Sequence, residues 1–225
     1  MNDKLKKLYS NKYFDKRKSN DDRRIKSFEH EGDLIRKYVS SGKLLDIGCS
    51  TGEFIESLCW DGEAYGVEIS DYAINEAIKK GIIVSETLPT GHDGTFDLII
   101  FRGTIQHLNQ PFETISACYN LLRDGGIVAF LATPNTNSLY YKIWNNLPAL
   151  DPLRNFYVPS DLALQQIMKN ENFQLREIEY PYWQSPYACP LRDFSKFVFK
   201  LIGFKVKFAF PGNMMNAIFQ KEKIR

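Results

Sequence analysis

Residues 43–52, Lys-Leu-Leu-Asp-Ile-Gly-Cys-Ser-Thr-Gly, constrain the fold of this chain more than any other segment. They join a short apolar run, typical of a buried strand, to a turn of small residues. An apolar helical pattern begins at once with Phe54 and Ile55. Because Gly48 and Gly52 lack a Cβ atom, the turn can be tight and a ligand can approach its backbone closely. A strand, turn and helix of this kind predict a site for a nucleotide-like ligand.

The spacing around this turn distinguishes between classes of nucleotide-binding site. A dinucleotide fingerprint requires G-x-G-x-x-G, but Ser50 and Glu53 occupy its second and third glycine positions. A P-loop is excluded because no Gly-Lys-Ser or Gly-Lys-Thr follows. Instead, Asp46 precedes the turn and Glu68 ends the next apolar run. A carboxylate at the end of the second strand can bind a ribose diol, and the carboxylate of Asp46 suits a positively charged ligand better than a pyrophosphate.

These features resemble those of the class I S-adenosylmethionine (SAM) dependent methyltransferases, whose first motif is an acid followed by G-x-G-x-G. Ser50 stands here at the middle glycine, which is a mild change. Residues 96–101 are similar to the fourth strand of that family and residues 102–108 to its active-site loop. Residues 121–131 are similar to the following helix end, glycine turn and fifth strand. The resemblance covers residues 30–135 and 156–180.

The resemblance implies SAM as the cofactor and assigns cofactor-binding roles to the matching residues. Glu86 is expected to contact adenine from a shifted position, with an exposed loop residue as the alternative. Arg102 is expected to bind the methionine carboxylate or an acidic substrate. The predicted cofactor-binding set is Asp46, Gly48, Cys49, Ser50, Gly52, Glu68, Ile69, Glu86 and Arg102.

His107 is the candidate general base, because it follows the fourth strand where related enzymes keep their reactive loop and because imidazole works near neutral pH. The alternative is a histidine that packs beneath the methionine part of SAM or caps the loop. His30 and His92 have no such placement, and the three histidines lack metal-ligand spacing, so no metal is expected. The predicted substrate-binding residues are Gln106, Tyr140, Tyr141, Trp144 and Tyr157.

Alternating strands and helices predict an α/β Rossmann-like doubly wound sheet, mostly parallel, with an antiparallel last strand and aromatic lid insertions. One structural domain is expected, with a basic helical arm at 1–42, a SAM-binding core at 43–133, and a substrate lid and completion of the sheet at 134–225. The predicted strands are 43–47, 64–69, 82–85, 96–101, 127–132, 173–180 and 213–220. The predicted helices are 22–40, 53–60, 71–80, 111–122 and 160–170.

Charge and apolar patterns at the two ends of the chain leave alternatives open. Residues 1–30 contain ten Lys and Arg against five Asp and Glu, a net charge of +5. A solvated helix over the sheet edge is the preferred interpretation, ahead of a nucleic-acid contact. Residues 192–210 combine a basic helical stripe with an alternating, strand-like run from Phe204 to Phe210. They can cover the domain's own sheet or a second copy of the chain, which is preferred, or contact a membrane at its periphery.

Taken together, these patterns predict a cytoplasmic SAM-dependent methyltransferase that acts on a small molecule. Scattered cysteines favour free thiols in a reducing compartment, and the start of the chain lacks an apolar signal core. The resemblance favours O-methylation of a sugar or surface-polysaccharide precursor, with a phosphorylated or nucleotide-linked form included. A phenolic or quinone O-methyltransferase is the first alternative, and a SAM-binding partner protein without catalysis is the second. An RNA-modifying enzyme is disfavoured, because no Asn/Asp-Pro-Pro-aromatic loop follows the fourth strand.

Overall fold

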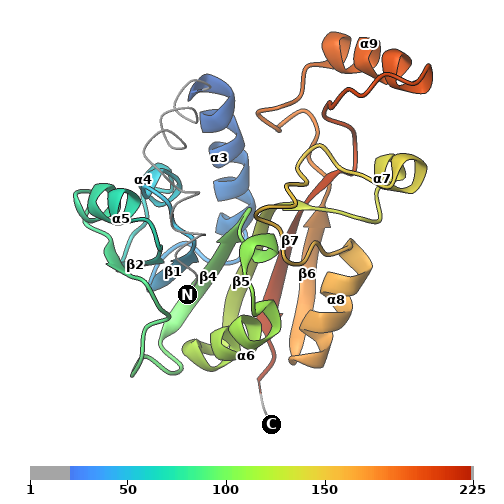
Figure 1. The fold of residues 1–225 in the computed structure, drawn as a ribbon. Coiled ribbons are helices and arrows are strands. Elements are labelled where there is room, and N and C mark those ends of the chain that lie inside the picture. Colours follow the sequence, from blue (N-terminus) through green and yellow to red (C-terminus); the bar gives the residue numbers. More distant parts are fainter. Residues whose placement is uncertain (1–20, 224–225) are drawn as a thin grey trace.

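A computed structural model describes residues 21–223, which form a seven-stranded sheet with helices on both faces (Figure 1). The strand order is β3-β2-β1-β4-β5-β7-β6, with parallel pairing from β3 to β5. β7 pairs antiparallel with β5 and with β6, which confirms the predicted mixed sheet. The strands are β1 Leu44–Ile47, β2 Ala64–Val67, β3 Ile83–Ser85, β4 Phe96–Arg102, β5 Leu122–Pro134, β6 Phe173–Glu179 and β7 Met214–Lys221.

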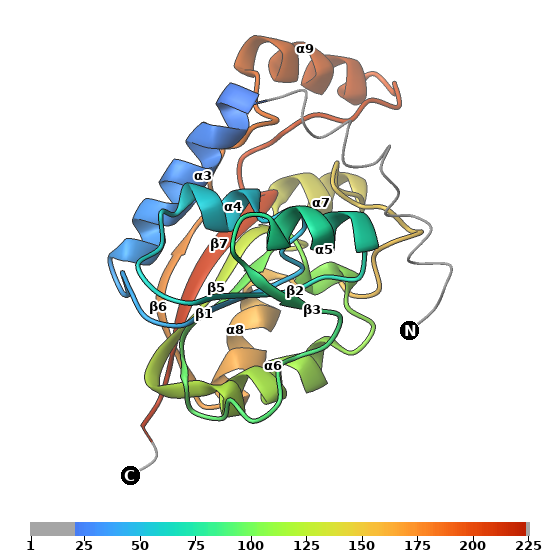
Figure 2. The ribbon, with the colours of Figure 1, turned by 90° about the vertical axis from the view of Figure 1, so that its left-hand side faces the viewer.

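Two layers of helices enclose this sheet, as Figure 2 shows from the side of the first layer. The first layer contains α3 (Asp21–Arg36), α4 (Glu53–Ser57) and α5 (Asp71–Ile78). The second contains α6 (Pro111–Leu121) and α8 (Asp161–Asn170). The helix starts follow local chemistry, because Pro111 occupies the first turn of α6 and the Ser160 hydroxyl accepts a hydrogen bond from the Ala163 N–H at 3.0 Å.

The core lies on both faces of the sheet because side chains along a strand alternate in direction. On the face of α3, α4 and α5, Leu44 and Leu98 pack among the apolar residues of those helices. On the opposite face, Leu45 and Phe101 pack against residues from α6 and α8. The Phe101 ring stacks on that of Phe130, with centroids 4.9 Å apart. The carboxyl ends of the central strands are therefore held in place by buried contacts on both sides.

Several predicted boundaries were wrong. α3 ends at Arg36 and not at residue 40. The glycine turn expected before the fifth strand is an irregularity within β5, where pairing jumps from Phe96↔Leu122 to Leu98↔Ile127 and Gly125 takes a φ of +73°. Residues 204–210 form no strand. The part of the predicted basic arm that spans residues 1–20 lies outside the described residues.

The predicted lid contains two helices, α7 (Leu139–Trp144) and α9 (Pro190–Leu201), and it has a small apolar core of its own. Tyr140, Leu147 and Phe208 are buried together, and Trp144 packs against them. The rings of Tyr140 and Trp144 lie 4.6 Å apart, and those of Tyr140 and Phe208 lie 5.1 Å apart. Tyr140, predicted to bind substrate, is only 1% exposed. This burial makes the ring part of the core of the lid, and its contact with substrate stays a prediction.

We expect Tyr140→Ala to lower the free energy of unfolding by about 3–5 kcal/mol, the usual cost of removing a large buried aromatic side chain. Ile143→Ala on the same helix is the matched control, because Ile143 is 51% exposed and its replacement should cost less than about 1 kcal/mol. Urea denaturation of both variants measures the difference. Equal stability of the two variants would contradict the assignment of Tyr140 to the core of the lid.

Candidate functional site

The glycine turn after β1 takes a conformation that its sequence does not readily favour. Ser50, at the position of the middle glycine, has a φ of +55°, in the left-handed region that costs a non-glycine residue about 1–2 kcal/mol. The Ser50 N–H donates to Oε2 of Glu68 at 3.0 Å, which holds the turn in place. A Cβ built on Gly48 would lie 2.7 Å from the side chain of Thr104. The backbone of the turn therefore packs closely against the loop after β4, as the small residues predicted.

Glu68 organises the adjacent end of β2. Its Oε1 accepts hydrogen bonds from the N–H groups of Ile69 and Ser70, at 2.7 and 2.9 Å. Together with the bond from Ser50, these contacts place the carboxylate beside the glycine turn. The Glu68 carboxylate already accepts three backbone hydrogen bonds, and a ribose hydroxyl would be a further donor to it. Glu68 therefore holds the shape of the predicted site and is also available to a ligand.

Asp46 is a buried carboxyl group at the carboxyl end of β1. The residue is 2% exposed, and Oδ1 has no hydrogen-bond partner among the described residues. Burial raises the pKa of Asp46 to about 7; the charge of Glu68 adds to the rise, and that of Arg102 opposes it. A buried carboxyl oxygen without a partner is costly, and a cationic group or an N–H donor from a ligand would remove that cost.

Arg102, at the end of β4, forms an ion pair that the sequence did not indicate. Its Nε donates to Oε2 of Glu31 at 2.6 Å, and its Nη2 donates to Oε1 at 3.3 Å. The guanidinium also lies over the Phe28 ring, 4.3 Å from its centroid. This pair fastens α3 to the loop after β4. The predicted contact of Arg102 with the methionine carboxylate stays a prediction. Because Nε and Nη2 bind Glu31, this contact would have to use Nη1.

His107 lies in a short 3-10 turn, Ile105–His107, that follows β4. Its Nδ1 is 3.0 Å from the carbonyl oxygen of Arg154, and its Nε2 is 3.2 Å from Nε2 of Gln106. Because a carbonyl only accepts and an amide nitrogen only donates, Nδ1 carries the proton and Nε2 carries the lone pair. The ring is thereby set as the neutral tautomer with a basic Nε2, which is the form that a general base requires.

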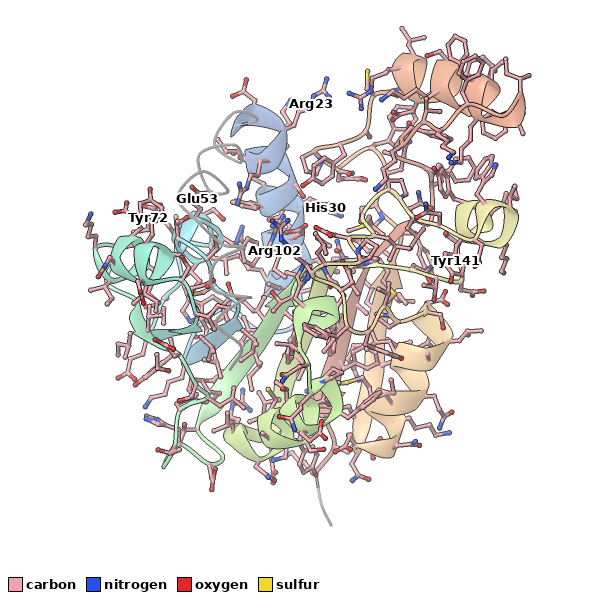
Figure 3. All side chains as sticks on the ribbon, viewed as in Figure 1. Arg23, His30, Glu53, Tyr72, Arg102 and Tyr141 are labelled. Atoms are coloured by element: carbon pink, nitrogen blue, oxygen red, sulfur yellow. The ribbon has the colours of Figure 1, made fainter. Side chains whose placement is uncertain are left out.

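The other residues predicted to contact ligands divide into two groups. The Tyr157 ring lies 5.4 Å from that of Phe112, at the start of α6, and the Phe156 N–H donates to the carbonyl oxygen of Gln106. Tyr157 and Gln106 therefore belong to the neighbourhood of His107. Tyr141 and Trp144 pack against the core of the lid instead, and Figure 3 shows Tyr141 well apart from Arg102.

For two residues predicted to bind the cofactor, Cys49 and Glu86, the structure does not direct the side chain into the glycine turn. Cys49 is buried, and its Sγ packs against Gly66, where an added Cβ would lie 2.4 Å from the sulfur. Burial raises the pKa of the Cys49 thiol, so it is inert, and only its backbone is available to a ligand. Glu86 is exposed in the loop after β3, where its adenine contact stays a prediction.

Sequence reasoning missed a polar network at the carboxyl ends of β5 and β6. Nε2 of His30 lies 2.7 Å from Oε1 of Glu179, and the Asn216 amide donates to the same oxygen at 2.7 Å. Oδ1 of Asn216 accepts a hydrogen bond from the Ala132 N–H. Figure 3 shows His30 on α3 close to Arg102. No sequence motif connects these residues, because they come together only when α3 folds across the strand ends.

Other features of the surface do not coincide with this site. A hollow of about 220 Å³ lies between β2, β3 and the loop after β3, and neither Asp46, Glu68 nor His107 lines it. Within residues 21–223, no group of three or more His, Cys, Asp and Glu could hold a metal ion. The candidate site is therefore located by the buried polar groups that meet at the strand ends and not by this surface hollow.

Comparison with known proteins agrees with this geometry. A family model described as a methyltransferase domain matches residues 19–178. This chain is a SAM-dependent methyltransferase. The solved SAM-dependent methyltransferase from Archaeoglobus fulgidus has a similar fold, with a TM-score of 0.65 and 21% identity over 94% of this chain and 100% of that chain.

Two curated relatives of this methyltransferase are named ubiquinone biosynthesis O-methyltransferase. The protein from Saccharophagus degradans is 28% identical over 163 residues, which cover 64% of this chain and 68% of that protein. The protein from Thiobacillus denitrificans is 26% identical over 117 residues, which cover 47% of this chain and 50% of that protein. The chain therefore spans half to two thirds of the length of these relatives.

The residues of the methyltransferase at the strand ends fit SAM on two observations. Oδ1 of Asp46, which has no partner among residues 21–223, is suited to an ammonium group, an N–H donor or the field of a sulfonium. The close backbone of Gly48 and the carboxylate of Glu68 border the same turn. We expect Asp46 and Glu68 to bind the cofactor, with Ser50 and Ile69 placed by Glu68.

We expect the raised pKa of Asp46 to make the SAM affinity of the methyltransferase depend on pH. The cationic cofactor favours the ionised carboxylate, so below pH about 7 binding must release the proton that Asp46 holds. We expect the SAM affinity to fall by up to about tenfold per pH unit between pH 7 and pH 5, and Asp46→Asn to remove this dependence. Calorimetry in two buffers of different ionisation enthalpy measures the released proton directly.

Unfolding of the ligand-free chain provides the control. A carboxyl group whose pKa is higher in the folded than in the unfolded state binds more protons when folded between pH about 4 and about 7. The contribution of Asp46 to stability is therefore present below pH 4 and is lost as the pH rises to 7. Asp46→Asn should make the ligand-free protein more stable than the wild type above pH 7. Equal stability there, with SAM binding that is independent of pH, would contradict the role given to Asp46.

Proposed function

We propose that this methyltransferase transfers the methyl group of SAM to a hydroxyl oxygen of a small molecule, and that a phenolic or quinol hydroxyl is the acceptor. The observation that carries the proposal is the position of His107: its Nδ1 lies 3.0 Å from the carbonyl oxygen of Arg154, which favours a proton on Nδ1 and a lone pair on Nε2 that can accept a proton from a hydroxyl group. The names of the curated relatives support the phenolic class.

The strength of the base favours a phenol over an aliphatic alcohol. Imidazole has an ordinary pKa of about 6.5 and a phenolic hydroxyl of about 10, so a histidine can share the proton of a phenol as the oxygen attacks. An aliphatic sugar hydroxyl is less acidic, and the same base removes its proton less readily. When bound, SAM supplies a methyl group on a positively charged sulfur that leaves as a neutral thioether.

In this proposal, residues of the chain orient the acceptor and remove its proton. The carbonyl of Arg154 holds Nδ1–H of His107, and Gln106 holds the other side of the ring. The 3.2 Å contact from Gln106 is at the long end for a hydrogen bond, so an acceptor hydroxyl can replace it at Nε2. Gln106 then keeps its bond to the carbonyl oxygen of Gly103 at 2.9 Å. Asp46 and Glu68 would hold the cofactor beside this loop.

A sugar hydroxyl, as in a polysaccharide precursor, is the second candidate acceptor. It is favoured by the network of His30, Glu179 and Asn216, which places hydrogen-bonding groups at the carboxyl ends of β5 and β6. Such groups suit a ligand with several hydroxyls. Incubation with methyl-tritiated SAM and matched panels of catechols, 4-hydroxybenzoate derivatives, monosaccharides and nucleotide sugars distinguishes the two classes. Label transfer confined to the sugars would overturn the phenolic proposal.

We expect His107→Ala to slow the methyl-transfer step by about 10²–10⁴-fold and to leave SAM affinity nearly unchanged, because the change removes the proton acceptor and no predicted cofactor contact. With SAM saturating at every pH, the fall in the wild-type rate at low pH should also be absent from the variant. Single-turnover kinetics with the acceptor found above is the measurement, since slow product release can mask the chemical step.

His92→Ala is the matched control, because His92 packs against the Tyr65 and Phe96 rings, away from the loop of His107. A His107→Ala variant that transfers the methyl group within a few-fold of the wild-type rate would show that His107 only packs. A large loss of SAM affinity in that variant would argue for a role in holding the cofactor.

A further inference from the structure

Helix α9, Pro190–Leu201, exposes an apolar stripe, although the side that faces the lid contributes Phe197 to the apolar core there. Leu191 and Phe194 are 88% and 70% exposed, and Ile202, just after the helix, is 67% exposed. On a helix, positions 191, 194, 198, 201 and 202 form one stripe. The opposite side carries Asp193, which is buried. A helix of a globular domain normally buries its apolar stripe, so this arrangement requires another apolar environment.

The inward side of α9 is fixed by specific polar contacts, so the helix cannot simply roll over. Asp193 accepts hydrogen bonds through Oδ2 from the Cys189 N–H at 2.7 Å and from the Tyr182 hydroxyl at 3.1 Å. Nζ of Lys200 lies 5.2 Å from the centroids of both the Tyr140 and Trp144 rings. These contacts hold α9 on the lid with its apolar stripe pointing away from the protein.

The position of α9 confirms that this stripe does not cover the sheet. In Figures 1 and 2 the helix lies apart from the sheet, beyond the carboxyl ends of the parallel strands. Of the two covers preferred from the sequence, the domain's own sheet was wrong, and a second copy of the chain stays a prediction. Phe204 is also 58% exposed, and Trp183 and Tyr187 are exposed in the loop before the helix.

The charge around the apolar stripe is strongly basic. Residues 183–210 contain five Lys and Arg and one Asp, a net charge of +4, and the single acid is buried. Nζ of Lys196 and of Lys200 donate to the carbonyl oxygens of Lys207 and Val206, so both ammonium groups stay close to the segment that follows the helix. Exposed phenylalanines and leucines bordered by lysines are the pattern of a helix that lies in the headgroup region of an anionic bilayer.

We propose that α9 and the segments that flank it, residues 183–210, bind the surface of an anionic phospholipid membrane. The apolar stripe enters the acyl boundary, and the exposed Arg192, Lys205 and Lys207 contact the lipid phosphates. A second copy of the chain fits less well, because a symmetric contact through α9 would bring two segments of charge +4 together. Among the described residues no helix is long and apolar enough to cross a bilayer, so the contact is one of surface binding.

The test uses the purified full-length chain and vesicles of phosphatidylcholine alone or mixed with phosphatidylglycerol. We expect the wild type to float with the mixed vesicles, to bind the neutral vesicles at least about tenfold more weakly, and to lose affinity as salt is raised. The double variant Leu191→Ser, Phe194→Ser should bind the mixed vesicles at least about tenfold more weakly. Lys205→Glu, at an exposed position beside the helix, should also weaken binding and its dependence on salt.

Leu162→Ser is the matched control, because Leu162 on α8 is 64% exposed and lies outside the proposed surface. Circular dichroism with thermal melting confirms that each variant is folded. Absence of binding to the mixed vesicles would overturn the proposal. The proposal would also be overturned if the double variant bound the mixed vesicles as tightly as the wild type. That result would assign the binding to residues 1–20, which carry a net charge of +5. If the wild type were a dimer without lipid and the double variant a monomer, the apolar stripe would be the contact with a second copy of the chain, and the membrane proposal would be overturned.

Discussion

The buried carboxyl group of Asp46 is the constraint around which the predicted site is built. A carboxylate in an apolar interior is destabilising unless a partner compensates it, and the fold provides no partner for Oδ1 within the described residues. Arg102 offsets part of the cost through its charge, but the guanidinium is bonded to Glu31. A ligand with positive charge therefore stabilises the group best. We therefore expect the same imbalance that weakens the ligand-free protein to favour a sulfonium cofactor at this site.

The order of the strands determines which residues share this environment. β1 pairs with β2 on one side and with β4 on the other, so the carboxyl ends of these three parallel strands lie side by side. Asp46, Glu68 and the loop of His107 follow from those ends, far apart in sequence and adjacent in space. The crevice outside the carboxyl ends of such a sheet is where α/β proteins bind ligands, because helices cover the two faces.

Much of this arrangement could be predicted from sequence, because it depends on local patterns. Short apolar runs gave the strands, and Ser160 and Pro111 gave helix starts. Contacts between distant segments could not be predicted in the same way. The Arg102–Glu31 pair and the burial of Tyr140 depend on how α3 and the lid pack, which no spacing encodes. The stripe on α9 was visible as a helical pattern, but its outward direction depends on Asp193, whose partners are known only in the folded chain.

The packing of α3 connects the cofactor end of the site to the acceptor end. Glu31 binds Arg102 at the end of β4, while the neighbouring His30 contacts Glu179 at the end of β6. Because both contacts involve ionisable groups, the position of α3 depends on charge as well as on apolar burial. Breaking the buried pair on one side would leave an uncompensated charge, a cost of about 3–5 kcal/mol in comparable sites. Neighbouring residues of α3 therefore fasten the helix at the ends of both β4 and β6, so the network of His30 holds α3 over the strand ends whether or not it also binds an acceptor.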